Sequence, residues 1–152
     1  MMDDIGLNKW LNITTCADLF STQAHLVHYT SALRYPVFRN GENYNGTPSM
    51  VKHSQLRNMI ETCLAQEAKI LGGKTLWLPL GPKVTEALDH LCTIGALQPS
   101  QVLSGMPHPS GANAERIKIF LGEKNPEAAS VKTNPYRLLE AKRDLVEKLK
   151  IA

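Results

Sequence analysis

The chain has 152 residues, of which 43% are hydrophobic, and it carries a formal net charge of +3. This length suits one domain with a sizeable core, and the mildly basic charge is compatible with nucleic acid without requiring it. No apolar run reaches the ~20 residues of a membrane-spanning helix, so no membrane partner is expected. The acidic start Met1-Met2-Asp3-Asp4 is unlike a secretory signal, and the cytoplasm is the expected compartment.

The three cysteines, Cys16, Cys63 and Cys92, are far apart in the sequence. None belongs to a pair with the spacing of a zinc or iron–sulfur site, so no metal is expected. Cys63 and Cys92 fall on the apolar faces of predicted helices. We interpret these two as reduced core residues.

Three stretches are predicted as buried strands, because their apolar and β-branched residues run continuously, as in sheets covered on both faces. These stretches are residues 24–33, 75–80 and 101–104. Apolar residues at helical spacing predict helices between and after them. The predicted helices are residues 54–70, 82–94, 114–121 and 135–149, with a shorter one near residues 7–11.

The order strand, helix, strand, helix, strand, helix is typical of an α/β protein with right-handed crossovers. We therefore expect a three-layer sandwich, with a small, mainly parallel central sheet and helices on both faces. Three strands make a small sheet, so a further strand or a partner is expected to complete it. One domain is expected over residues 1–152.

Residues 105–113 carry the strongest chemical signal in the chain. His108 lies between Pro107 and Pro109, and the proline rings fix φ and bias the residues before them toward extended conformations. The imidazole is therefore expected in a stiff loop at the carboxyl end of a strand. In open α/β sheets, ligands bind at that place.

The loop leads into a predicted helix through Ser110, Gly111 and Asn113. These residues offer a hydroxyl, an unhindered backbone and an amide at a helix start, which suits an anion such as phosphate. The alternative interpretation is an ordinary turn, because Pro, Ser and Gly clusters are common in turns.

Residues 39–49 are rich in Asn, Gly and Pro and are expected to form a loop. One interpretation is a plain surface excursion. The other is a nucleic-acid-binding loop, because aromatic and basic side chains together can stack on bases and contact phosphates. The side chains in question are those of Tyr35, Phe38, Arg39 and Tyr44.

Most of the chain, from about His25 to Gly122, resembles the carboxyl-terminal part of the uracil-DNA glycosylase superfamily. The family's motifs are similar to Leu78-Pro79-Leu80-Gly81 and, after a helix and a strand, to Gly105-Met106-Pro107-His108-Pro109-Ser110. The continuation to Arg116 looks like the single-strand-selective and related bacterial branches. The resemblance implies one glycosylase-like domain that lacks the family's first strand and motif.

The resemblance also implies a DNA repair enzyme that flips uracil out of DNA and hydrolyses its N-glycosidic bond. In the family, a histidine at the position of His108 stabilises the negative charge of the leaving base. Residues that match Ser110, Gly111 and Asn113 hold the DNA backbone, and Arg116 is one turn away, where it would meet a second phosphate. The implied partner is uracil-containing DNA, single- or double-stranded, and no cofactor is implied.

Two departures from the family pattern bear on this activity. Thr30 or Ser31 stands where the family reads the base with an asparagine, and a hydroxyl cannot make the paired contact of an amide. With Tyr35, these residues form the expected base pocket. Nothing in residues 1–23 matches the first motif, which positions the attacking water with a carboxylate or amide.

Three hypotheses follow from these residues. The first is a DNA glycosylase, either a fragment of a longer enzyme or a diverged stand-alone protein. The second is a catalytically inactive DNA-binding remnant of that fold. The third is a small-molecule α/β enzyme, which has no Gly-x-Ser-x-Gly elbow or phosphate-loop lysine in its favour.

Overall fold

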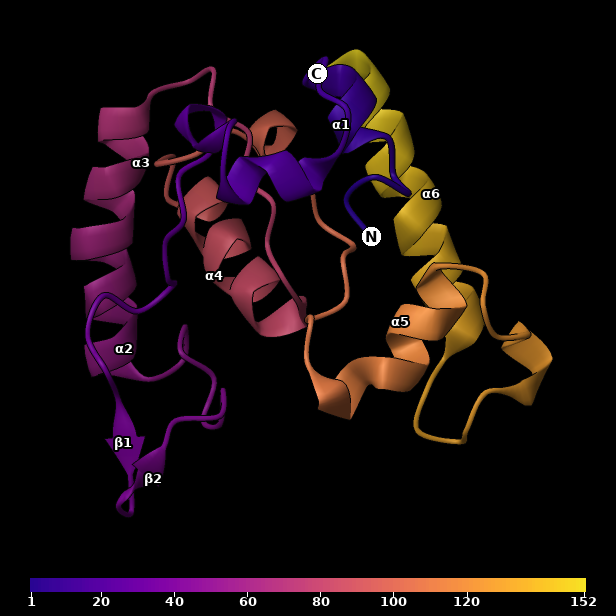
Figure 1. Cartoon of the computed structure of the whole chain (residues 1–152). Coiled ribbons are helices and arrows are strands. Elements are labelled where there is room, and N and C mark those ends of the chain that lie inside the picture. Colours follow the sequence, from indigo (N-terminus) through magenta and orange to yellow (C-terminus); the bar gives the residue numbers. More distant parts are fainter. The chain divides into compact units, whose positions relative to one another are not determined.

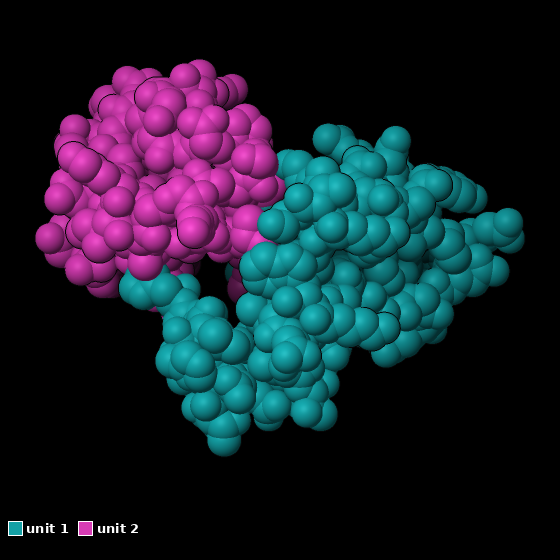
Figure 2. All heavy atoms as spheres, turned by 90° about the horizontal axis from the view of Figure 1, so that it is seen from above, with its two compact units in different colours: residues 1–28, 103–152 teal, residues 29–102 magenta.

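The computed structural model describes all residues from 1 to 152 (Figure 1). The chain falls into two compact units, which Figure 2 shows in teal and magenta. The first unit combines Met1–His28 with Leu103–Ala152, and the second is Tyr29–Val102. The expectation of a single domain over residues 1–152 stays a prediction.

The first unit is built on α6 (Pro135–Ile151), against which α5 (Ala114–Phe120) and α1 (Leu7–Trp10) pack (Figure 1). Four short 3-10 turns complete it. They are η1 (Cys16–Phe20), η2 (Ala24–Leu26), η5 (Gly111–Asn113) and η6 (Pro126–Ala128).

Lys142 of α6 ties three segments of the first unit together. Its ammonium group lies 2.5 Å from the Asp4 carboxylate and donates a hydrogen bond of 2.6 Å to the Phe120 carbonyl at the end of α5. The same group lies 4.9 Å from the centroid of the Phe120 ring, where a cation is attracted to the ring face. The buried side chains of this unit include Ile5, Leu7, Leu19, Leu103, Met106, Ile119, Phe120, Leu145 and Leu149.

The second unit consists of one long helix, a second helix beside it and a hairpin (Figure 1). The long helix runs through α2 (Ser54–Met59), a π-helical segment η3 (Ile60–Leu64) and α3 (Ala65–Leu71). The helix packed on it is α4 (Pro82–Thr93), and η4 (Pro99–Gln101) is a short 3-10 turn. The hairpin pairs β1 (Phe38–Arg39) with β2 (Glu42–Asn43).

The predicted helices are confirmed, because their apolar stripes find a core. In the second unit, buried residues from the long helix and α4 pack together, Ile60 and Leu91 among them. Pro82 occupies the first turn of α4, where its missing N–H costs nothing. Asn134 caps α6 by accepting a hydrogen bond of 3.1 Å from the Arg137 amide.

The predicted three-layer α/β sandwich with a parallel central sheet is wrong. The protein is mostly helical, and its one sheet is the antiparallel β1–β2 pair with two residues in each strand. The only trace of parallel pairing is a single bridge between Trp77 and Val102, in which the Trp77 amide donates to the Gln101 carbonyl at 2.7 Å.

Competing local hydrogen bonds explain why the predicted strands did not form. The Thr75 amide donates to Gly72, and the amides of Gln101 and Val102 donate to Gln98 and Pro99 within a turn. Pro79 has no amide to donate. These backbone amides are therefore not available for hydrogen bonds between strands. Only the pair Trp77 and Val102 is left in parallel register.

The stretch predicted as the first strand, residues 24–33, is largely exposed. Leu26 keeps 43% of its surface in solvent and Tyr29 keeps 56%. The stretch begins with the turn η2, in which the Leu26 and Val27 amides donate to Gln23 and Ala24. The stretch belongs to no sheet and is not covered on both faces, as the predicted strand would be.

No helix of the structure combines the length and the apolar character that crossing a lipid bilayer requires.

Gly105 provides a test of the packing in the first unit. Its φ is +120°, and a β-carbon placed there would lie 2.6 Å from the Ala141 carbonyl oxygen of α6. Gly105→Ala should therefore lower the free energy of unfolding by about 3 kcal/mol or more, through backbone strain together with overpacking. Urea unfolding followed by circular dichroism measures this loss.

Gly122→Ala is the matched control. Gly122 also has a positive φ, +77°, but a β-carbon there would meet no atom within 4 Å. Its substitution should cost only the backbone strain, about 1–2 kcal/mol. Equal losses in the two variants would contradict the close approach of Gly105 to α6.

Candidate functional site

The backbone passes from buried to exposed residues at His108 in the first unit. Met106 and Pro107 are buried, whereas His108 and Pro109 are exposed. The Ser110 amide donates to the His108 carbonyl at 2.9 Å and closes the loop. The structure therefore places His108 in a loop whose imidazole is exposed, but the strand predicted to precede that loop is absent.

A row of side-chain hydrogen bonds begins directly after this histidine. The Asn113 side-chain amide donates to the Ser110 hydroxyl oxygen at 2.9 Å. The Arg116 guanidinium donates from Nη1 to the Asn113 Oδ1 at 2.7 Å and from Nη2 to the Lys132 carbonyl at 3.2 Å. The structure thus brings together three of the four predicted phosphate-binding residues. Gly111, the fourth, is exposed beside them.

Glu115 fastens the polar segment that follows α5. Its carboxylate accepts hydrogen bonds from the Lys124 ammonium at 2.7 Å, the Ser130 amide at 3.0 Å, the Ser130 hydroxyl at 2.6 Å and the Thr133 hydroxyl at 2.7 Å. The segment predicted as a polar linker, residues 123–133, is therefore held in place. Since this segment supplies the Lys132 carbonyl, Glu115 also helps to fix Arg116.

These donors hold the pKa of the Glu115 carboxyl well below its ordinary value. The Lys124 ammonium is the largest cause, followed by the hydroxyl of Ser130, that of Thr133 and the Ser130 amide. Each favours the charged form of the carboxyl. Glu115 is therefore a carboxylate at neutral pH and serves as a structural acceptor.

The predicted base-pocket residues Thr30, Ser31 and Tyr35 belong to the second unit, whereas His108 belongs to the first. All three are exposed, and Tyr35 keeps 64% of its surface in solvent. The Thr30 hydroxyl donates to a Glu67 carboxylate oxygen at 2.7 Å. The structure does not gather these three side chains into an enclosed pocket.

The sequence patterns did not lead to the prediction of the β1–β2 hairpin, which spans residues 38–43. The signal was the Asn40-Gly41 dipeptide, because both residues readily adopt the positive φ that a two-residue hairpin turn requires. Their φ values are +52° and +80°. The hairpin places Phe38 on a fixed ribbon instead of a loose loop.

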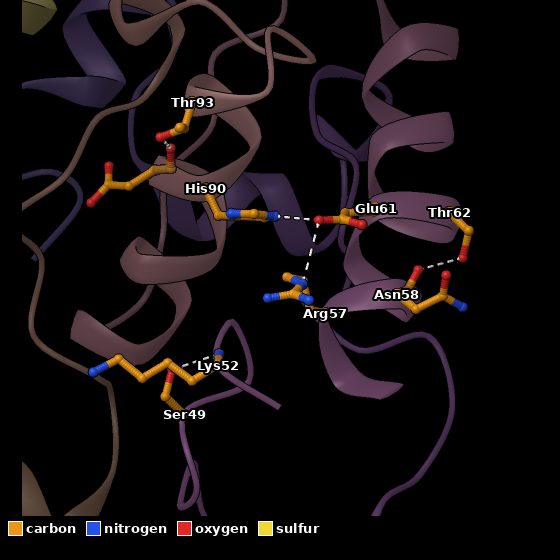
Figure 3. A network of polar contacts seen from close by, with 9 residues as sticks. Ser49, Lys52, Arg57, Asn58, Glu61, Thr62, His90 and Thr93 are labelled. Carbon is orange, nitrogen blue, oxygen red and sulfur yellow. Dashed lines mark hydrogen bonds and ion pairs between the residues drawn. The ribbon is translucent and has the colours of Figure 1, made fainter. Parts of the chain in front are cut away.

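A second polar cluster joins the two helices of the second unit (Figure 3). The Glu61 carboxylate lies 2.7 Å from His90 Nε2 of α4 and 3.8 Å from Arg57 Nε, one turn earlier on its own helix. Glu61 belongs to the π-helical segment, a feature that often marks functional sites. Here, each of these three side chains has a partner within the unit, so the cluster is structural.

The structure also shows how the cysteines and the possible metal ligands are arranged. No group of three or more His, Cys, Asp or Glu residues is arranged to hold a metal ion, and none of the three cysteines forms a disulfide. Burial, reinforced by the adjacent Asp3, raises the pKa of the Cys16 thiol to about 12. A thiol that stays protonated at neutral pH is a poor nucleophile.

The Glu115 contacts predict a pH dependence of stability. Because folding lowers the pKa of this carboxyl, its stabilising effect is complete above the ordinary value of 4.5 and declines as the pH falls toward the folded pKa. Glu115→Gln should therefore lower the melting temperature at pH 7 and less so below pH 4.5, as thermal unfolding across pH would show.

Glu140→Gln is the matched control, because Glu140 is an exposed carboxylate on α6. That variant should melt like the wild type at neutral pH. If Glu115→Gln shows the same deficit at every pH, the loss is not linked to ionisation of this carboxyl.

One comparison with known proteins gives a relative. The chain is 35% identical over 128 residues to the uncharacterized protein YoxB of Bacillus subtilis (strain 168). The alignment covers 84% of this chain and 49% of YoxB, so the chain spans about half the length of that relative. No family model matches the chain, and no solved structure matches it. The name of YoxB states no activity.

Proposed function

We propose that this protein acts on DNA in the manner of a uracil-DNA glycosylase, with the His108 loop as the element that meets the nucleic acid. One observation carries the proposal. An exposed imidazole, clamped between prolines, is followed by the hydrogen-bonded row of Ser110, Asn113 and Arg116. The row ends in a fixed cation beside an exposed backbone, which suits a phosphodiester.

The row leaves donors free for a phosphate. A guanidinium carries five N–H donors, and the bonds to Asn113 and Lys132 use only two of them. The Ser110 hydroxyl accepts from Asn113 and keeps its own O–H to donate. A β-carbon at Gly111 would meet no atom within 4 Å, so a phosphate can approach the backbone there.

His108 has the chemistry to assist departure of a base. A uracil costs a few kcal/mol to flip out of the base stack. When its N-glycosidic bond breaks, it leaves as an anion that shares its charge with the carbonyl oxygen O2. An imidazole N–H held at that oxygen would stabilise the charge in the transition state. A preorganised donor of this kind contributes ~3–4 kcal/mol in a dry site, which here requires bound DNA to cover the exposed imidazole.

A second candidate function is DNA binding without base removal. It is favoured by the exposure of Thr30, Ser31 and Tyr35, which do not enclose a base. The resemblance also assigns no residue of this chain to positioning the attacking water. In this alternative, the His108 loop still binds the DNA backbone, but no glycosidic bond is broken.

The phosphate contact predicts a change in salt dependence. Arg116→Ala should weaken binding to duplex DNA at low salt and reduce the slope of log K against log salt by about 1, as for one lost phosphate contact. Fluorescence anisotropy at several salt concentrations measures both quantities. Lys118→Ala removes an equal charge from the same helix at an exposed position outside the row.

The Lys118 variant should retain the slope of the wild type. Equal slopes for all three proteins would show that Arg116 makes no phosphate contact and would count against the proposed role of the loop.

Uracil release distinguishes the two candidate functions. If the protein is a glycosylase, His108→Ala should reduce the rate of release from uracil-containing DNA by about 10²–10³-fold, since one donor to the leaving charge is lost. The assay compares single- and double-stranded substrates by alkaline cleavage of the abasic product. His25→Ala, which removes another exposed histidine of the first unit, is the control.

If the His108→Ala variant releases uracil as fast as the wild type does, the role proposed for this imidazole is wrong. DNA binding with no release by the wild type would instead select the non-catalytic alternative.

A further inference from the structure

Two consecutive side chains of α5 bind the same turn of the chain. The turn runs from Ser130 to Thr133, and the Thr133 amide closes it by donating to the Ser130 carbonyl at 2.9 Å. Glu115 accepts from the hydroxyls of Ser130 and Thr133, at 2.6 and 2.7 Å. Arg116, the next residue, donates from Nη2 to the Lys132 carbonyl of this turn at 3.2 Å. We refer to these contacts together as the clasp.

Polar contacts, and not apolar packing, hold the turn in place. The segment that contains it loops out from the end of α5 and returns to the start of α6 (Figure 1). None of the four residues of the turn is buried, and its one apolar side chain, Val131, is fully exposed. A turn that buries no apolar side chain gains little from the hydrophobic effect. Its position therefore depends on its hydrogen bonds to Glu115, which include one from the Ser130 amide at 3.0 Å.

The turn presents the Lys132 carbonyl to Arg116. The hydrogen bond that closes the turn uses the Ser130 carbonyl, so the Lys132 carbonyl can accept from a side chain outside the turn. The two residues whose hydroxyls Glu115 binds lie on either side of Lys132 in the sequence. A displacement of either of them therefore moves the carbonyl that Arg116 binds.

The Lys132 carbonyl matters because it orders a flexible side chain. Arginine has a long side chain that loses conformational freedom when it binds a ligand, and this loss weakens binding. Arg116 is already ordered, since Nη1 is bound to Asn113 Oδ1 at 2.7 Å and Nη2 to the Lys132 carbonyl. The remaining N–H donors of the guanidinium thus have a fixed direction before an anion binds.

We infer that Ser130 and Thr133 are positioning residues for the binding of a phosphate group by Arg116. They act through Glu115 and the Lys132 carbonyl, which together set the direction of the guanidinium. This inference deepens the proposed function and rests on it for the phosphate contact of Arg116. It adds that the affinity of this contact is controlled by a turn whose hydroxyls bind Glu115 and not the phosphate.

Glu115 makes it possible to separate the effect of charge from that of position. Its carboxylate is adjacent to Arg116 in the sequence, so by charge alone its removal would strengthen the binding of an anion nearby. Its removal also frees the turn, which by our inference weakens the binding. The two explanations therefore predict opposite changes in phosphate affinity for Glu115→Ala.

The test follows the Arg116 Nε–H group of the full chain by nuclear magnetic resonance, first alone and then during titration with inorganic phosphate. In Ser130→Ala/Thr133→Val, which keeps the net charge, the order parameter of this group should fall below about 0.6. The dissociation constant for phosphate should rise about fivefold. Glu115→Ala should also bind phosphate more weakly than the wild type. Thr133→Ser, which keeps the hydroxyl, should match the wild type in both measurements.

Thr14→Val is the matched control, because it removes an exposed threonine hydroxyl of the same unit outside the clasp. It should leave the order parameter and the dissociation constant unchanged, and circular dichroism verifies that each variant is folded. An unchanged order parameter in the double variant overturns the inference, as does a lower order parameter with an unchanged dissociation constant. Tighter phosphate binding by Glu115→Ala also overturns it, since charge would then outweigh position.

The outcomes separate this inference from the proposed function. If the wild type binds phosphate at Arg116 and the double variant binds it equally well, the inference is wrong and the phosphate contact of the proposed function stands. If the Arg116 resonance of the wild type does not respond to phosphate, that contact is rejected and the inference is rejected with it.

Discussion

The close approach of Gly105 to α6 is the constraint on which the arrangement of the first unit depends. Only a residue without a β-carbon can lie so near the Ala141 carbonyl at a φ of +120°. From there, Met106 and Pro107 continue into the core, and the chain leaves it at His108. The position of the imidazole is thus set by packing against a helix, because no strand directly precedes the loop to set it.

Hydrogen bonds fix the residues that are proposed to bind DNA, which follow this loop in the sequence. Arg116 is fixed by Asn113 and by the Lys132 carbonyl, and Glu115 fastens the segment that supplies this carbonyl. All of these groups lie in the first unit. A phosphate-binding role for this surface therefore does not require the parallel sheet that the sequence pattern favoured.

Sequence patterns predicted the helices well and the strands poorly, for a physical reason. A helix satisfies its backbone locally, so the apolar stripes that include Ile60, Leu91 and Leu145 were enough to locate three of them. A buried strand needs a neighbouring strand to pair with, and the stretch of residues 24–33 belongs to no sheet. At Gln101 and Val102, a local turn uses the amides instead of a ladder.

In the candidate site, too, the features that depend on residues close in sequence were predictable, and those that depend on distant residues were not. The proline clamp around His108 and the neighbourhood of Ser110, Asn113 and Arg116 were predictable, because they depend on residues close in sequence. The role of Glu115 was not, since its partners Lys124, Ser130 and Thr133 come from a segment that composition describes only as polar. Nor could spacing alone show that Thr30, Ser31 and Tyr35 stay exposed.

The central proposal is that this protein binds DNA through the His108 loop. The most direct measurement is a nuclear magnetic resonance titration of nitrogen-15-labelled protein with a short uracil-containing oligonucleotide. We expect the amides of residues 108–113 and the Arg116 side chain to shift together and to saturate with one dissociation constant. Binding that leaves these resonances unmoved while others shift would contradict the account.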